Sequence, residues 1–186
     1  MIRTFVAVDI PESESLRNFL GRLKDSGSRL SVPRAEGVHV TLKFLGDIPE
    51  ASVEKISEIL REIATSFMQF EVEIKGSGCF PNPRNPRVLW AGLQDNGQLV
   101  ELARRVDESM VRIGFEPEKR AFTPHITIAR VKSPKDIDKA MNILREFEDE
   151  SFGSFKVIDI RLKKSTLTPS GALYEDLSVL KLSETV

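Results

Sequence analysis

The sequence predicts an α+β protein of two lobes, each a mainly antiparallel sheet with outer helices, that face each other across a central cleft with approximate twofold symmetry. Three observations predict this fold. Strand-like and helix-like hydrophobic patterns alternate along the chain, their order occurs twice, and the only two histidines stand at matching positions of the two copies. With 186 residues, the chain is long enough to bury a substantial core.

The first copy begins with the apolar stretch TFVAVDI, which we expect to form a strand. Pro11 then opens an amphipathic helix. After the loop SVPRAEG comes the strand HVTLKFLG, which begins at His39, and a second helix follows from Pro49. The strands FEVEIKG and RVLWAGL complete this copy.

RVLWAGL also begins the second copy, which continues with an amphipathic helix, the strand HITIAR from His125, a helix from Pro134, and strands that contain FKV and LYE. Pro49, FEV and VLW begin 10, 31 and 49 residues after His39, while Pro134, FKV and LYE begin 9, 30 and 48 residues after His125. We therefore expect residues 1–186 to form one bilobal domain with an internal repeat over roughly residues 5–93 and 89–180.

Composition and charge narrow the class of protein. The 27 Lys and Arg residues nearly balance the 28 Asp and Glu residues, for a net charge of −1. This balance argues against tracking along a long nucleic acid by bulk electrostatics, although it allows a local positive pocket. The single cysteine, Cys79, cannot form an internal disulfide, and no stretch approaches the roughly 20 apolar residues of a membrane span. We expect a cytoplasmic monomer without metal or cofactor.

The strand HVTLKFLG has one polar and one apolar face, because side chains alternate along a strand. Strict alternation places His39, Thr41 and Lys43 on one face and puts Phe44 with the apolar residues on the other. If helices cover the apolar face of each sheet, the polar face of this strand points into the cleft.

The strand HITIAR repeats the same pattern. His125 and Thr127 share a face, and strict alternation places Arg130 on the opposite face unless the strand bends or ends first. A single His-x-Thr pattern is most simply a surface histidine beside a strand-forming threonine. Because both histidines occur in this pattern at matching positions of the repeat, we expect both motifs to meet across the cleft.

Two imidazoles that face each other are suited to paired acid and base catalysis, because their ordinary pKa of about 6.5 lets one be neutral while the other is protonated near neutral pH. The simplest matching chemistry is displacement at phosphorus. One histidine would deprotonate the attacking oxygen and the other would protonate the leaving oxygen. The hydroxyls of Thr41 and Thr127 would donate hydrogen bonds to the non-bridging oxygens, without need of a metal.

The motifs HVTLKFLG and PHITIAR, together with FPNPRNPRVLWAG between them, resemble the two-histidine phosphoesterase superfamily, specifically its archaeal and bacterial RNA 2′,3′-cyclic phosphodiesterases, long labelled 2′-5′ RNA ligases. This resemblance implies a bilobal α+β fold and a metal-independent enzyme. It implies that His39 is the proton donor to the leaving 3′ oxygen and His125 the proton acceptor that activates water. The expected product is a 2′-phosphate. The resemblance also implies a reversible 2′-5′ ligation of RNA ends that needs no ATP.

Several other residues are candidates to bind substrate. Arg130 and Lys43 would contact phosphate, with a surface ion pair and a solvated lysine as the alternatives. Arg84 and Arg87, in the proline-rich loop PNPRNPR, are candidates for RNA contact or simply parts of a stiff connector.

Four aromatic residues are candidates to stack a base, with core packing as the alternative, namely Phe44, Phe80, Trp90 and Phe122. Two further functions stay open. The chain would be a non-catalytic binder of phosphorylated RNA ends or nucleotides, or a phosphodiesterase for another small cyclic phosphate. Retention of both His and both Thr favours an enzyme, because Lys or Arg would serve binding alone as well.

Overall fold

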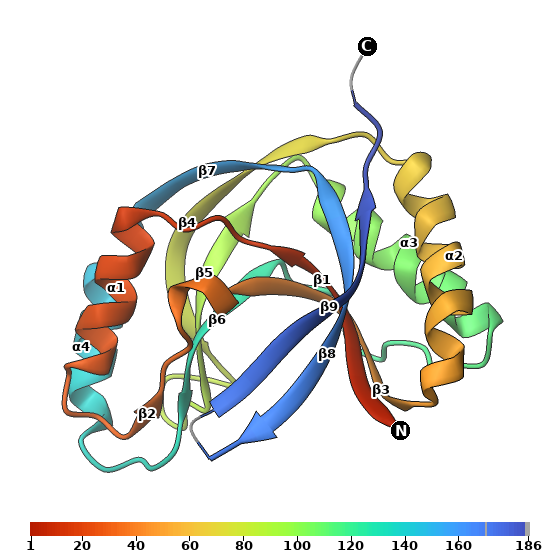
Figure 1. The fold of residues 1–186 in the computed structure, drawn as a ribbon. Helices are drawn as coiled ribbons and strands as arrows, with labels where there is room; N and C mark the ends of the chain where they lie inside the picture. Colours follow the sequence, from red (N-terminus) through yellow and green to blue (C-terminus); the bar gives the residue numbers. More distant parts are fainter. Residues whose placement is uncertain (170, 185–186) are drawn as a thin grey trace.

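The computed structural model describes residues 1–169 and 171–184 of the chain as two antiparallel sheets between two pairs of helices (Figure 1). Sheet A has four strands in the order β3-β1-β8-β9, and sheet B has five in the order β2-β6-β5-β4-β7. The strands of sheet A are β1 (Ile2–Asp9), β3 (His39–Ile48), β8 (Asp159–Thr168) and β9 (Gly171–Lys181). Those of sheet B are β2 (Leu30–Ser31), β4 (Phe70–Phe80), β5 (Val88–Gln94), β6 (His125–Val131) and β7 (Ser151–Val157).

Each sheet has one pair of helices on its outer face. The helices α2 (Val53–Thr65) and α3 (Gln98–Arg112) pack on sheet A, and α1 (Glu14–Lys24) and α4 (Ile137–Glu146) pack on sheet B (Figure 1). Two short 3-10 turns, Ala35–Gly37 and Glu50–Ser52, precede β3 and α2. The predicted α+β class, the two mainly antiparallel sheets and the outer helices are confirmed.

The helices begin close to the prolines that predicted them. Ser13 lies two residues after Pro11 and caps α1, because its side chain accepts a hydrogen bond from the backbone N–H of Leu16. Pro49 precedes the turn that leads into α2, and the carbonyl of Pro134 accepts from the N–H of Ile137 at the start of α4. Each helix buries its apolar stripe against its sheet.

The two copies of the repeat do not form one lobe each. Sheet A joins β1 and β3 from the first half of the chain to β8 and β9 from the second, and sheet B mixes the halves as well. The helices cross over too, because α1 follows β1 of sheet A but packs on sheet B, while α3 follows β5 of sheet B but packs on sheet A. The two lobes are therefore interleaved along the chain.

Strand β8 was not predicted, although it occupies the centre of sheet A between β1 and β9. Its buried residues Ile160 and Leu162 alternate with Arg161, which points to the other face. This alternation was a usable signal, but the dense charge of the segment IRLKK hides it. Among the residues described, none of the helices is long and apolar enough to cross a membrane.

Candidate active site

The two histidine strands occupy equivalent places in the two sheets. Strand β3 pairs with β1, the first strand of its copy, and β6 pairs with β5, which starts the second copy. Strands β3 and β6 also contact each other directly, so the two sheets meet where the motifs lie. Because helices cover the outer faces, the His and Thr side chains of both motifs lie on the inner faces of the sheets.

Both imidazoles are held in the same way by the backbone. His39 Nδ1–H donates to the carbonyl oxygen of Gly37 at 2.8 Å, and His125 Nδ1–H donates to that of Thr123 at 2.6 Å. A carbonyl can only accept, so in each ring the proton must be on Nδ1 when the imidazole is neutral. Nε2 of each histidine is therefore the atom left to take or give a proton.

Aromatic side chains fix the orientation of both rings. The ring of His39 lies 4.9 Å from that of Phe5 and 4.8 Å from that of Tyr174, with the Tyr174 contact edge to face. The ring of His125 meets that of Phe80 edge to face at 5.1 Å. Phe80, a stacking candidate, thus supports a histidine from the side.

His39 lies in a mixed electrostatic environment. Burial lowers the pKa of His39 below its ordinary value, and the cations of Lys163 and Arg130 act in the same direction. The hydrogen bond to Gly37 and the carboxylate of Asp9 raise the pKa and oppose this shift. Arg130, which belongs to the other motif, is thus among the charges that act on His39.

A β-bulge in β6 turns Arg130 to the inner face. Thr127 pairs with Trp90 and Ala129 with Leu89, so Ile128 is an extra residue opposite two consecutive residues of β5. Both Ile128 and Ala129 are buried, and the alternation resumes one residue out of phase. Arg130 therefore shares the face of His125, contrary to strict alternation, and is available as the phosphate contact that the sequence suggested.

The same bulge occurs at the matching position of β3. Thr41 pairs with Ala7 and Lys43 with Val6, which makes Leu42 the extra residue. Phe44 consequently turns to the inner face, where it is 61% exposed and its ring lies 6.2 Å from that of Phe5. The prediction that Phe44 packs on the apolar face is wrong, and this residue stays a candidate for substrate contact.

The prediction that Lys43 shares the face of His39 is also wrong. The bulge turns Lys43 to the outer face, where only 5% of the residue is exposed. Its Nζ donates to Asp107 Oδ1 at 2.5 Å and to the carbonyl oxygen of Glu116 at 2.8 Å. Lys43 therefore fastens α3 and the loop after it to sheet A and does not face the histidines.

Thr41 and Thr127 lie on the inner faces beside their histidines and are partly exposed. Within residues 1–169 and 171–184, the hydroxyl of neither threonine has a hydrogen-bond partner. Two free hydroxyls at equivalent positions of both motifs are suited to bind the non-bridging oxygens of a phosphate.

Trp90 of β5 is the register partner of Thr127 on one side and of Gly78 on the other. A Cβ atom added to Gly78 would lie 2.2 Å from the Trp90 ring, so the indole occupies the space that any side chain at position 78 would need. Phe122 packs partly buried against the core. Of the remaining aromatic candidates, Trp90 is the one that lies beside a motif threonine.

A charged network next to His39 was not predicted. Lys163, on β8, is 6% exposed and donates to Asp9 at 2.9 Å and to Asp176 at 2.5 Å, while Arg161 bridges the same two carboxylates. Asp9 is the register partner of His39. The network was missed because β8, which supplies both cations, was missed.

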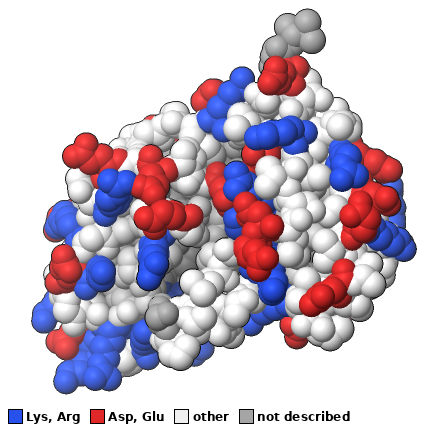
Figure 2. Space-filling view, in the orientation of Figure 1, with Lys and Arg blue, Asp and Glu red and all other residues white. Residues whose placement is uncertain are grey.

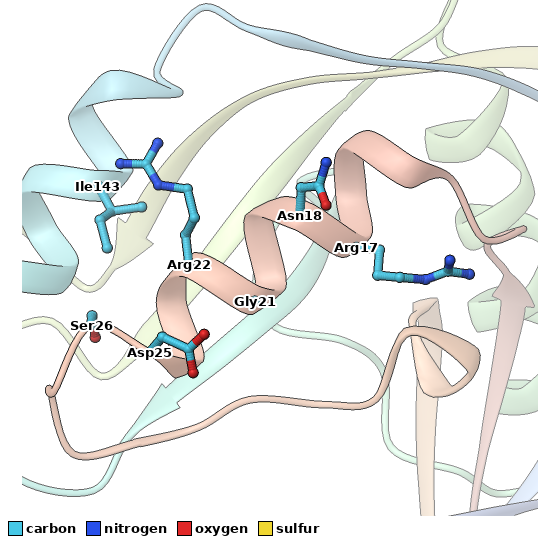
Figure 3. Close-up of a pocket in the computed structure, with 7 residues that line it drawn as sticks. All are labelled: Arg17, Asn18, Gly21, Arg22, Asp25, Ser26 and Ile143. Atoms are coloured by element: carbon cyan, nitrogen blue, oxygen red, sulfur yellow. The ribbon is translucent and has the colours of Figure 1, made fainter.

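Two pockets are lined by residues of sheet B or of its helices. One of about 640 Å³ is on the outer surface between α1 and α4 (Figure 3), where its arginines, Arg17 and Arg22, are already paired with Glu12 and Glu146. The other, of about 320 Å³, is lined by residues of β4 and β5, Trp90 among them, and by Thr123 and Pro124, which precede His125. Within the described ranges, no three His, Cys, Asp or Glu residues gather as a set that could hold a metal.

Comparisons with known proteins identify the family of the chain. The model of the 2′-5′ RNA ligase superfamily matches residues 12–165. The chain is 37% identical to a protein of Methanothermobacter thermautotrophicus over 97% of this chain and 99% of that one, and 40% identical to one of Archaeoglobus fulgidus over 97% and 100%. Both relatives are named RNA 2′,3′-cyclic phosphodiesterase.

Solved structures show the same fold. The crystal structure of TT0787 of Thermus thermophilus is similar with a TM-score of 0.81 at 26% identity, covering 97% of this chain and 98% of that one. The apo form of E. coli LigT is similar with a TM-score of 0.72 at 23% identity, covering 98% of each chain. The family resemblance of the two His-x-Thr motifs is thus confirmed, and the chain belongs to the 2′-5′ RNA ligase superfamily of two-histidine phosphoesterases.

Proposed function

We propose that this chain hydrolyses 2′,3′-cyclic phosphates at RNA ends or on nucleosides to 2′-phosphates, with His39 as proton donor and His125 as proton acceptor. The observation that carries the proposal is the twin arrangement of the motifs. Each motif offers an imidazole whose Nδ1 is fixed by a backbone carbonyl, and a threonine hydroxyl without a partner among the described residues, on the inner face of its sheet. Such a pair supplies one acid, one base and two phosphate contacts.

The relatives support the class of reaction. Proteins that are 37% and 40% identical over nearly their whole length are named RNA 2′,3′-cyclic phosphodiesterase. The chain is accordingly an enzyme of the phosphodiesterase class. The roles of individual residues rest on geometry and on the family resemblance.

In the proposed mechanism, Nε2 of His125 takes a proton from water as the water oxygen attacks phosphorus. The bond from phosphorus to the 3′ oxygen breaks, and Nε2 of His39 gives its proton to that oxygen. The product carries a 2′-phosphate and a 3′-hydroxyl, and proton exchange with solvent restores the starting protonation states of both rings. Thr41, Thr127 and Arg130 stabilise the negative charge on the non-bridging oxygens.

Asp9 and the carbonyl of Gly37 assist the donor role of His39. Both raise the pKa of a ring whose burial, as the larger effect, lowers it. They therefore favour the protonated imidazole that the mechanism needs at the start of the reaction. The pKa that results is still below the ordinary histidine value.

Ligation follows from the same chemistry when a ribose hydroxyl replaces water. Water at about 55 M makes hydrolysis the dominant outcome unless a second RNA end is bound with a higher effective concentration. We also propose that the enzyme works without metal or ATP, in the cytoplasm and as a monomer, because one chain supplies both histidines and both threonines.

The test is to incubate the protein with 2′,3′-cyclic AMP and with an oligoribonucleotide that ends in a cyclic phosphate, in excess chelator, and to identify the product isomer. We expect a 2′-phosphate, and we expect both His39→Ala and His125→Ala to lower turnover by about 10³-fold or more. Turnover that requires a metal, or that survives both substitutions, would refute the mechanism. Tight binding of the cyclic end without turnover would instead favour the non-catalytic binder.

A further inference from the structure

Among the described residues, Lys and Arg side chains without an ion-pair partner gather at the end of β6 that lies away from His125. Lys and Arg side chains cluster at the lower left of Figure 2, over the connections between α1 and β2 and between β6 and α4 that Figure 1 shows there. We call the following residues of β6 and the neighbouring loops the basic rim: Arg29, Arg34, Arg84, Arg87, Arg130, Lys132 and Lys135.

Backbone hydrogen bonds place the central members of the basic rim side by side. The N–H of Lys132 donates to the carbonyl of Arg29 at 2.8 Å, and the N–H of Val131 donates to that of Arg87 at 2.9 Å. Three segments of the chain therefore meet at the end of β6. Lys132 follows the last residue of β6 and is exposed, so the rim runs outward from the motif that carries Arg130.

The members of the basic rim have no ion-pair partner among the described residues. Some cations elsewhere are paired, as Arg104 is with Glu101 and Glu108, and Arg161 with Asp9, whereas the seven members of the rim all lack such a partner in the described part of the chain. Clustered charges of one sign create a local positive potential, so a group of cations without carboxylate partners attracts anions. In a chain with a net charge of −1, this local excess of positive charge is a property of the rim and not of the overall composition.

The equivalent end of β3 has the opposite character. Beyond its bulge, β3 continues from Phe44 through Gly46 to the exposed Asp47, and Glu50 follows. At the matching position of β6, the chain continues from Arg130 to Lys132. The ends of the two motif strands therefore carry opposite charges, and sheet B is the side that attracts an extended polyanion.

We propose that the basic rim binds the backbone phosphates of the RNA strand that precedes the cyclic end, so that the enzyme prefers oligonucleotides to mononucleotides. This inference rests on the proposed function for the identity of the cyclic end. Each phosphate that is neutralised on a single strand contributes about 0.7 to the slope of log affinity against log salt. Two or three contacts therefore weaken binding roughly 7- to 20-fold between about 50 and 200 mM salt.

The test compares an octaribonucleotide that ends in a 2′,3′-cyclic phosphate with 2′,3′-cyclic AMP, using the wild-type chain and the double variant Arg29→Gln/Lys132→Gln. Neither substituted residue belongs to the catalytic machinery. In the variant, we expect KM for the oligonucleotide to be about tenfold higher and to change less with salt concentration. We expect the rate of cyclic AMP hydrolysis to stay within about twofold of wild type. The matched control, Lys55→Gln/Arg61→Gln, removes the same charge from the exposed face of α2.

Equal KM values for the two substrates in the wild type would overturn the basic rim while the hydrolase stands. An equal rise of KM for the oligonucleotide in the rim variant and in the Lys55→Gln/Arg61→Gln control would also overturn the basic rim. Fluorescence anisotropy of the labelled octaribonucleotide, measured over the same salt range, separates the two proposals. If no cyclic phosphate is hydrolysed, the proposed function fails, and salt-dependent binding that the rim variant alone weakens would still support the rim as a site for RNA.

Discussion

His39 is surrounded by groups that raise its pKa and by groups that lower it. Its pKa is lowered first by burial and raised by the carbonyl of Gly37 and the carboxylate of Asp9. Lys163, which also lowers the pKa, is itself neutralised by Asp9. Asp9 therefore affects His39 twice, directly and through Lys163, and both effects raise the pKa.

We expect Asp9→Asn to lower the pKa of His39 further. As the proposed donor, His39 must be protonated, so activity falls as pH rises through its pKa. The alkaline limb of the profile of kcat/KM against pH should move to lower pH, while the acidic limb, assigned to the base, moves less. The check is a pH profile with cyclic AMP beside Asp47→Asn, which removes an exposed carboxylate. An alkaline limb that stays in place or moves to higher pH would contradict this role.

Lys43 is a buried charged residue that stabilises the fold. Replacing it by Met leaves Asp107 and the carbonyl of Glu116 without their cation. Because Asp107 is partly exposed, we expect a loss of about 1–3 kcal/mol in the free energy of unfolding, below the range for a fully buried pair. Urea titration measures the loss, with Lys55→Met as the exposed control.

The same Lys43→Met variant should keep kcat/KM for cyclic AMP within about threefold of wild type at temperatures where it is folded. A tenfold or larger loss of kcat/KM in a variant of unchanged stability would restore Lys43 to the active site. The bulge at Leu42 is the reason that we expect the opposite.

At the scale of the element, the twin bulges mark the limit of what the sequence could predict. The type and order of most strands and helices follow from hydrophobic periodicity, and the placement of His39, Thr41, His125 and Thr127 follows from alternation. A bulge is one extra residue in an otherwise ordinary strand, and nothing in the side chains of Leu42 or Ile128 identifies it. Every candidate residue after it was therefore assigned to the wrong face, Arg130 among them.

The interleaving of the lobes could not be predicted for a different reason. Local sequence determines whether a segment is a strand, but pairing partners far apart in the chain are chosen by the assembled core. The segment FKV was placed correctly as a strand, yet it pairs with β4 of the first half. The charged strand β8, which pairs with β1, was hidden by its density of cations.

Gly78 in strand β4 leaves room for the ring of Trp90. At Gly78 a methyl group would meet the Trp90 ring at 2.2 Å, so Gly78→Ala must displace the indole beside Thr127. We expect a loss of about 1–3 kcal/mol in stability from overpacking, with a raised KM for cyclic AMP. Thermal unfolding and steady-state kinetics measure both effects.

The control for that substitution is Gly21→Ala, which places the same methyl group on helix α1, where nothing beyond the neighbouring residues and the backbone of the helix lies within 4 Å. It should be neutral or stabilise the protein by up to about 1 kcal/mol. If Gly78→Ala behaves like Gly21→Ala in both assays, the indole is not fixed against β4.

At the scale of the whole molecule, the interleaved chain predicts a single cooperative unit. Each sheet takes strands from both halves, and helices α1 and α3 each pack on the sheet opposite to the strand that precedes them. We expect calorimetry to show one unfolding transition whose calorimetric and van't Hoff enthalpies agree. Fragments 1–93 and 94–186 should not fold separately but should regain activity when refolded together. Two resolved transitions would show that the lobes are independent domains.

The interleaving also bears on the rate of the chemical step. Two lobes joined by a single linker would have to find each other again before each turnover, at a cost in rotational and translational entropy. Here the repeated passage of the chain between the sheets holds β3 against β6, so the two strands that carry the motifs meet once, when the protein folds. The enzyme should therefore be a preorganised catalyst without domain closure, with a radius of gyration that is the same with and without substrate.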